Sequence, residues 1–326
     1  MRNKKIARNL WAQITTLILF AMLMGACGAA PETKTYKVGV VNYLDILQPI
    51  YDGFKAGLAD LGYVEGENIT FIYNGAVAAE RSAIEAEIQS LIDQDVDMIY
   101  AMGTLPTLVA KDLVAGTDIP VLFAPVIDPV GEGVVDSIAQ PGGNVTGVQT
   151  ANYSPKGLEW LLAIVPETEI VYVFYHPNDE VSLTVSQALP DAAENLGVEL
   201  ALTPVNSADE ALPIVQSLPA GASILMIPTP TFGALTSVEE LAVELHIPIG
   251  SYDQPSNNTL FSYMVDWPTQ GRQAARMADQ ILKGAQPADL PVETADPFFT
   301  INLPIAQKLG IVVPDSILNQ ADTILR

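Results

Sequence analysis

Apolar and polar positions follow two alternating patterns along this chain. Short runs that are apolar at almost every position, such as residues 36–41 and 96–101, predict buried strands. Between such runs lie longer stretches with apolar residues at helical spacing, such as 48–61, which ends at Gly62, and 79–92. Strands without a polar face, joined by helices, are typical of parallel sheets that helices cover on both sides. The pattern therefore predicts an α/β fold.

The same alternation runs along the chain twice. A first series ends in a strand at residues 144–150, which the loop-forming Pro141-Gly142-Gly143 precedes. A second series begins with a helix at 155–164 and ends with a strand at 247–250. Each series predicts one doubly wound sheet, and the other elements expected in them are strands 69–73, 119–123, 169–175, 199–203 and 223–227 and helices 105–114, 181–196, 208–218 and 237–245.

The last elements of the pattern are too few to form a third sheet. Strands at 259–264 and 298–303 and helices at 269–283 and 305–309 are expected to complete the first two sheets. The chain would then cross between two lobes at least twice. In doubly wound folds a ligand binds where the carboxyl ends of the strands meet, and we expect the site there.

The first 26 residues have a different character. A basic start, formed by Arg2, Lys4, Lys5 and Arg8, precedes an apolar stretch at 14–24. Small residues follow it, and this order predicts a secretory signal peptide at 1–26. A bilayer-spanning helix needs about 20 apolar residues, so the alternative, an uncleaved anchor helix, would be short. We expect residues 27–35 to form a tether that precedes the folded part of the chain.

Cys27 is the sole cysteine of the chain and directly follows the predicted cleavage point. A lone cysteine in an exported protein calls for a special role. Residues 24–27, Met-Gly-Ala-Cys, resemble the bacterial lipobox, whose cysteine is lipidated, although Met24 stands where Leu is usual. We therefore expect lipidation of Cys27, with a plain buried thiol as the alternative.

Composition narrows the class of protein further. The 326 residues are enough for two lobes, and 49% hydrophobic against 16% charged residues is typical of a folded chain. The formal net charge of −23 repels nucleic acid and anionic lipid headgroups, and loss of the signal would make it more negative. We expect no nucleic-acid partner.

Motifs for catalysis are missing from the sequence. Residues 39–43, Gly-Val-Val-Asn-Tyr, lack the spacing of a dinucleotide fingerprint, and neither a Walker motif nor a Gly-x-Ser-x-Gly elbow occurs. The two histidines, His176 and His246, lie far apart without cysteine partners, so we expect no metal site. The sequence predicts no cofactor and no enzyme.

Residues 119–147, Ile-Pro-Val-Leu-Phe-Ala-Pro-Val-Ile-Asp-Pro-Val-Gly-Glu-Gly-Val-Val-Asp-Ser-Ile-Ala-Gln-Pro-Gly-Gly-Asn-Val-Thr-Gly, resemble the signature of one ABC-transporter substrate-binding family. Its characterised members include binders of tryptophan and other aromatic amino acids. The resemblance continues at residues 62–68, 156–161, 271–275, 281–293 and 301–303. In one departure, Gly103-Thr104-Leu105-Pro106 stands where the family usually has Gly-Thr-Pro.

The resemblance implies a type I periplasmic-binding fold, with two lobes, a hinge of three crossovers and a ligand in the cleft. Carried over, lobe 1 comprises residues 36–149 plus 262–289, and lobe 2 comprises 150–261 plus 290–326. The implied function is an extracytoplasmic, lipid-anchored receptor that delivers a small solute, an aromatic or branched amino acid, to an ABC permease in the membrane.

Candidate ligand contacts in lobe 1 follow the ends of its strands. Thr104 is expected to cap the next helix, whose free amides suit a carboxylate, although an ordinary helix cap is the alternative. Apolar contact is expected from the segment after the fourth strand. The lobe 1 candidates are Asn42, Tyr43, Gly103, Thr104 and Pro125.

Candidate contacts in lobe 2 follow the same rule. Asp253 and Asp266 are expected to hold an amino group, with solvated loop carboxylates as the alternative. The tyrosines of both lobes are expected to stack on a flat ligand, with half-buried positions at the sheet ends as the alternative. The lobe 2 candidates are Tyr175, Asn178, Thr229, Thr231, Tyr252 and Asp253, and Asp266 is expected at the third crossover between the lobes.

Two other functions remain open on this sequence. A ligand-sensing subunit of a signalling system would have the same fold and the same cleft. An α/β enzyme would need a nucleophile or cofactor motif, which the sequence lacks. The gene neighbourhood of a permease and an ATPase would separate transport from sensing.

Overall fold

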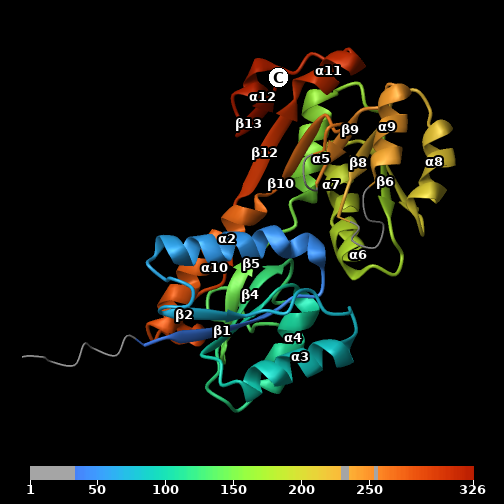
Figure 1. Cartoon of the computed structure of the whole chain (residues 1–326). Helices are drawn as coiled ribbons and strands as arrows, with labels where there is room; N and C mark the ends of the chain where they lie inside the picture. Colours follow the sequence, from blue (N-terminus) through green and yellow to red (C-terminus); the bar gives the residue numbers. More distant parts are fainter. Residues whose placement is uncertain (1–33, 229–234, 253–255) are drawn as a thin grey trace, which may run out of the picture. The chain divides into compact units, whose positions relative to one another are not determined.

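Two separate β-sheets organise the chain and confirm the predicted α/β class (Figure 1). The computed structural model describes residues 34–228, 235–252 and 256–326. Residues 36–326 form one unit and contain both sheets. The predicted signal peptide and Cys27 lie outside the described residues.

The first sheet has the strand order β11-β5-β4-β3-β1-β2, and each of its pairings is parallel. Its strands are β1 (Tyr36–Val41), β2 (Ile69–Ile72), β3 (Met98–Ala101), β4 (Val121–Val126), β5 (Val145–Gln149) and β11 (Glu293–Thr294). The helices packed on it are α2 (Gln48–Asp60), α3 (Arg81–Asp93), α4 (Thr104–Leu113) and α10 (Trp267–Leu282).

Both faces of the first sheet are buried. Successive residues of β3 belong to different apolar clusters, because side chains alternate across a strand. Met98 and Tyr100 join the cluster that includes α2 and α10, whereas Ile99 and Ala101 join the cluster of α3 and α4. This double burial explains why the strands are apolar throughout.

The second sheet has the order β13-β12-β10-β9-β8-β6-β7, with parallel pairings apart from the antiparallel pair β10–β12. Its strands are β6 (Ile170–Tyr175), β7 (Glu199–Pro204), β8 (Ala222–Met226), β9 (Ile249–Ser251), β10 (Phe261–Val265), β12 (Pro297–Asn302) and β13 (Thr323–Leu325). Its helices are α5 (Ser154–Ile164), α6 (Glu180–Gln187), α7 (Leu189–Leu196), α8 (Ala208–Gln216), α9 (Thr236–Glu244), α11 (Leu303–Leu309) and α12 (Asp315–Leu318).

The chain passes between the sheets after β5, after β10 and after β11. The boundary predicted at 261/262 falls inside β10, whose register with β9 places Phe261 opposite Gly250 in the second sheet. The boundary predicted at 289/290 precedes β11, which still pairs with β5 of the first sheet. Strand pairing decides these points, with Phe261 and Gly250 11 positions apart and Glu293 and Val148 145 apart, and the local pattern carries no information on them.

The single helix predicted at 181–196 is two helices in the structure, α6 and α7, which meet at Ala188. Pro190 occupies the first turn of α7, where its missing N–H leaves no hydrogen bond unmade. Local sequence pattern did not reveal the short elements η1 (Asp45–Leu47), η3 (Pro287–Asp289), α12, β11 and β13. None of the helices in the described part of the chain has the length and apolar character to cross a bilayer.

Helices α2 and α10 pack directly against each other through glycines (Figure 1). A Cβ atom on Gly271 would lie 2.0 Å from the Ile50 carbonyl oxygen, and one on Gly53 would lie 2.1 Å from the Pro268 carbonyl oxygen. The two backbones therefore touch where α10 begins. This contact fixes the position of the start of α10 against α2, which packs on the first sheet.

Candidate functional site

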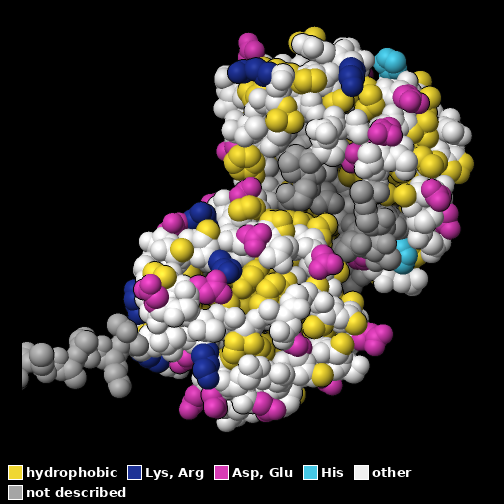
Figure 2. Space-filling model, viewed as in Figure 1, with side chains coloured by type: hydrophobic (Ala, Val, Ile, Leu, Met, Phe, Trp, Pro, Cys, Tyr) yellow, Lys and Arg dark blue, Asp and Glu magenta, His cyan; other side chains and the backbone are white. Residues whose placement is uncertain are grey.

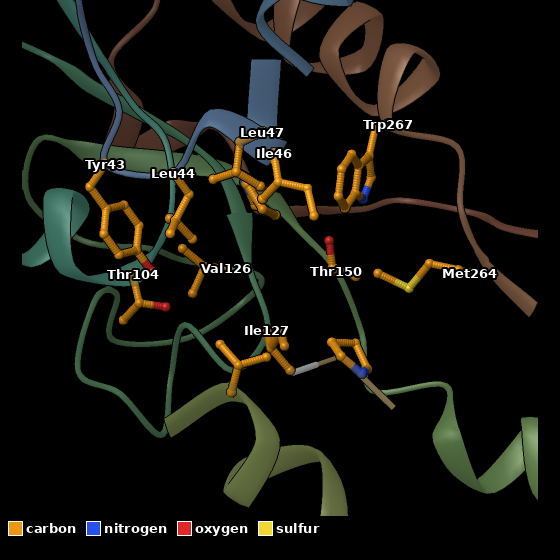
Figure 3. Close-up of a pocket in the computed structure, with 14 residues that line it drawn as sticks. Tyr43, Leu44, Ile46, Leu47, Thr104, Val126, Ile127, Thr150, Met264 and Trp267 are labelled. Carbon is orange, nitrogen blue, oxygen red and sulfur yellow. The ribbon is translucent and has the colours of Figure 1, made fainter. Parts of the chain in front are cut away.

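A pocket lies where strands of both sheets reach their carboxyl ends (Figure 3). Its volume is about 140 Å³. A protein cavity of roughly 150 Å³ lined by apolar side chains can hold benzene, so this pocket has room for one aromatic ring. The residues that line it are Tyr43, Leu44, Ile46, Leu47, Gly103, Thr104, Pro125, Val126, Ile127, Thr150, Val181, Pro228, Met264 and Trp267.

Four of the candidate residues line this pocket: Tyr43, Gly103, Thr104 and Pro125. Gly103 has φ +95°, and a Cβ there would lie 2.5 Å from Tyr43 Cε1, so the Tyr43 ring packs directly over it. Pro125 follows a cis peptide bond within β4. Parallel strands β1, β3 and β4 are neighbours, which brings these residues together.

Helix α4 begins differently from the prediction for Thr104. Gly103 is its N-cap and Thr104 is its first helical residue, so the expected cap by the Thr104 side chain is wrong. The positive φ of Gly103 starts the helix one residue earlier. The Thr104 hydroxyl instead points into the pocket in Figure 3. The amides of Thr104 and Leu105 are in the first turn, where a helix leaves its N–H groups unpaired.

Asn42 is fully buried and does not line the pocket. Its Oδ1 accepts a hydrogen bond from the Leu44 amide at 3.0 Å, and its Nδ2 donates to the Leu44 carbonyl at 3.0 Å. The same Nδ2 donates to Tyr73 Oη at 3.2 Å. Asn42 therefore holds the turn that carries Tyr43 and Leu44, and supports the pocket wall from behind.

The lobe 2 candidates that the structure describes lie outside the pocket lining. Tyr252 is fully buried and donates from its hydroxyl to the Ala151 carbonyl at 2.8 Å. Tyr175 is half-buried against the core, and Asn178 is exposed, with its amide donating to His176 Nδ1 at 3.2 Å. Candidates Thr229, Thr231 and Asp253 lie outside the described residues.

Asp266 is the N-cap of α10, directly before the pocket residue Trp267. Its Oδ2 accepts hydrogen bonds from the Thr269 amide at 3.0 Å and the Thr269 hydroxyl at 2.6 Å. The side chain of Asp266 does not line the pocket. Its carboxylate stabilises the helix start, as a capping residue does.

Most of the pocket wall consists of residues that the sequence analysis did not single out. Thr150 directly follows β5 and Trp267 soon follows β10, so the rule of carboxyl strand ends would have found both. Ile127 directly follows β4, so the same rule would have found it. Ile46 and Val181 come from η1 and α6, and apolar residues in such segments carry no distinguishing signal. Only the folded chain brings them to one cavity.

The lining favours an apolar ligand with a few polar atoms. None of the described lining residues is charged, and the side-chain polar groups are those of Tyr43, Thr104, Thr150 and Trp267. Acidic side chains are instead scattered over the surface seen in Figure 2. Across the described residues, no cluster of three or more His, Cys, Asp or Glu could hold a metal ion.

These features define the class of protein. The fold has two mainly parallel sheets with helices on both faces, and the chain passes from one sheet to the other more than once. This arrangement is a type I periplasmic-binding fold. The family model for ABC transporter substrate binding proteins matches residues 37–325, so the chain belongs to this family. It is a substrate-binding protein of an ABC transporter, as the sequence resemblance predicted.

Similar proteins include binders of aromatic amino acids. A tyrosine-binding protein of Clostridioides difficile is 28% identical over 248 residues, which cover 75% of this chain and 71% of that protein. An ABC domain in complex with L-Trp from Streptococcus pneumoniae is 26% identical, with a TM-score of 0.75 and coverage of 90% and 100%. A ligand-free, open substrate binding protein with adhesive properties from Clostridium difficile shares the fold, at 24% identity, TM-score 0.74 and coverage of 90% and 99%.

Proposed function

We propose that this protein is the extracytoplasmic receptor of an ABC importer and captures an aromatic or branched amino acid in the pocket described above. The observation that carries the proposal is the pocket itself, which is apolar, contains Trp267 and has room for one ring. A tyrosine-binding relative and a similar structure that holds L-Trp support the same ligand class.

The polar ends of such a ligand need partners beside the apolar wall. We propose that the ligand's carboxylate lies at the start of α4, near the Thr104 hydroxyl and the amides of Thr104 and Leu105. Unpaired amides and the positive end of the helix dipole favour a negative group there. Tyr43, Gly103 and Pro125 complete this side of the pocket.

Replacing Trp267 with alanine is expected to weaken binding of L-tryptophan and L-tyrosine about 10- to 100-fold. The indole is a large, half-buried part of the pocket wall, and truncating an aromatic contact removes both apolar area and ring-to-ring contact. Titration calorimetry on the ligand-stripped mature protein measures this directly.

Trp160 provides the matched control. It stacks on Phe299 at a centroid distance of 4.5 Å and does not line the pocket, so Trp160→Phe should leave affinity unchanged. Equal losses in both variants would point to general destabilisation. The proposal would be contradicted if Trp267→Ala bound L-tryptophan and L-tyrosine as tightly as the wild type. It would also be contradicted if the wild-type protein bound no amino acid.

We propose that the ligand's amino group reaches beyond the pocket lining to Asp266, which adjoins Trp267 and whose Oδ1 makes no hydrogen bond among the described residues. Asp266→Asn keeps the helix cap and removes the charge, so α10 should remain intact. We expect about 10-fold weaker binding of L-tyrosine by calorimetry, the scale of one charge-assisted hydrogen bond. An unchanged dissociation constant would show that Asp266 serves only the helix.

The remaining parts of the proposal concern location and partners. We propose that the signal-like residues 1–26 are removed, that Cys27 carries the lipid, and that a membrane permease receives the ligand. If the protein instead feeds a sensor, deletion of its gene would abolish a ligand response without reducing uptake of labelled L-tyrosine or L-tryptophan. Reduced uptake supports the importer.

A further inference from the structure

A buried glutamine contacts the pocket from behind. Gln270, in the second turn of α10, is 1% exposed. Its Nε2 lies 2.8 Å from the hydroxyl oxygen of Thr150, a residue that lines the pocket, and 3.5 Å from the Val148 carbonyl oxygen. Its Oε1 is also buried and has no hydrogen-bond partner among the described residues.

The surroundings determine which way the Gln270 amide is oriented. The Val148 carbonyl can only accept a hydrogen bond, so the atom facing it must be the NH2 group of Gln270. With the amide flipped, two oxygens would face each other and both amide hydrogens would be buried without a partner. Nε2 therefore donates to Thr150 Oγ1, and the hydroxyl of Thr150 is the acceptor in this pair.

This orientation decides what the Thr150 hydroxyl can offer to a ligand. A threonine hydroxyl has one hydrogen to donate, and Gln270 uses only an acceptor position on its oxygen. The described residues contain no acceptor bonded to the Thr150 hydroxyl hydrogen. Thr150 lies among the side chains that surround the cavity in Figure 3, close to Met264 and Trp267.

The position of Gln270 is held by helix packing. Its backbone amide donates to the Asp266 carbonyl at 2.9 Å, and the next residue, Gly271, meets the backbone of α2. Thr150 is fixed in turn by its own amide, which donates to the Val126 carbonyl at 2.8 Å. Both groups are thus placed by the first sheet and its helices before any ligand arrives, which limits the ordering that binding requires.

An unpaired buried carbonyl oxygen lowers stability, and a leucine of similar size would avoid it. The amide of Gln270 instead makes contacts that a leucine could not, since its Nε2 donates to the Thr150 hydroxyl oxygen and faces the Val148 carbonyl. The role that the contacts support is orientation of the neighbouring hydroxyl.

We infer that Thr150 donates a hydrogen bond to an acceptor oxygen of the bound ligand, and that Gln270 is the positioning residue that keeps the Thr150 hydroxyl in the donor state. This inference rests on the proposed function, because the oxygen belongs to an amino-acid ligand. Two oxygens of such a ligand have the required chemistry, the carboxylate and the phenol of a tyrosine side chain.

The test compares three probes, L-tyrosine, L-phenylalanine and tyramine, by titration calorimetry. Thr150→Val keeps the shape and removes the hydroxyl, and we expect about 10-fold weaker binding of L-tyrosine. Thr150→Ser keeps the hydroxyl and should stay within about 3-fold of wild type. If Thr150 donates to the phenol oxygen, Thr150→Val should leave the affinity for L-phenylalanine unchanged, because this ligand has no phenol. If Thr150 donates to the carboxylate, the substitution should leave the affinity for tyramine unchanged, because tyramine has no carboxylate.

Gln270→Leu tests the positioning role. It should weaken L-tyrosine binding about 3- to 10-fold, and the double variant should be no weaker than Thr150→Val alone, because Gln270 acts through the hydroxyl. A merely structural role would give additive losses, and would weaken all three probes alike.

The outcomes separate the inference from the proposed function. A wild-type protein that binds none of the three probes, and neither L-tryptophan nor a branched amino acid, contradicts the proposed amino-acid ligand. A wild-type protein that binds L-tyrosine, together with Thr150→Val of equal affinity for it, overturns the inference and leaves the proposed function in place. Additive losses in the double variant overturn the role of Gln270.

Discussion

Gly271→Ala is expected to destabilise the protein by about 3 kcal/mol or more, at the upper end of what overpacking causes. The new Cβ would lie 2.0 Å from the Ile50 carbonyl oxygen and 2.6 Å from the Phe54 amide nitrogen. Both are backbone atoms of α2, which no side-chain rotation can move aside. Either α10 shifts or α2 does, and chemical denaturation would measure the loss.

Gly157→Ala is the matched control, also buried and within a helix, α5. A Cβ at this position would meet Leu225 Cδ1 at 3.6 Å and Tyr252 Cβ at 3.8 Å, which are ordinary contact distances. Alanine is the better helix former, so this variant should be more stable by about 0.5–1 kcal/mol. Similar effects of the two substitutions would contradict the close packing of α2 on α10.

The packing of α2 on α10 also bears on the site. Trp267 is in the first turn of α10 and Leu47 precedes α2, so a shift between these helices would move the parts of the pocket wall that these two residues form. A partly folded Gly271→Ala protein should therefore lose ligand affinity as well as stability. The control variant should keep both.

Cys27→Ala is expected to abolish membrane attachment completely. The sole cysteine follows the predicted signal, and a lipid-modified residue is the anchor that the sequence predicts for the mature chain. Incorporation of labelled fatty acid and fractionation of cells measure the effect. The variant should be unlabelled and either unprocessed or released.

Adding Ala30→Cys to the Cys27→Ala chain controls for the thiol itself. A cysteine three residues outside the motif should not restore labelling, whereas a general requirement for any cysteine near the N-terminus would. If Cys27→Ala is fully processed and still fractionates with membranes, the lipobox interpretation is wrong.

Local sequence information places four of the described candidates at the edge of the pocket. Tyr43, Gly103, Thr104 and Pro125 lie within three residues of a strand end, and in parallel sheets such positions share one edge. The structure gives two other candidates a second role. Asn42 also follows a strand, yet its amide is used to hold the Leu44 backbone. Asp266 stands at the crossing after β10, where it caps α10.

The amino-acid sequence by itself determined the α/β class, the two successive sheets and the family, because double burial and helical spacing leave clear periodicities and the signature of residues 119–147 is specific. Tertiary structure alone decided that β10 belongs to the second sheet, that β11 returns to the first, and that Ile46 and Val181 line the same pocket. Those outcomes depend on strand register and on contacts between α2 and α10. The residues joined lie from 11 positions apart, as Phe261 and Gly250 do, to more than 200 apart, as Ile50 and Gly271 do, and they leave no periodic trace in the chain.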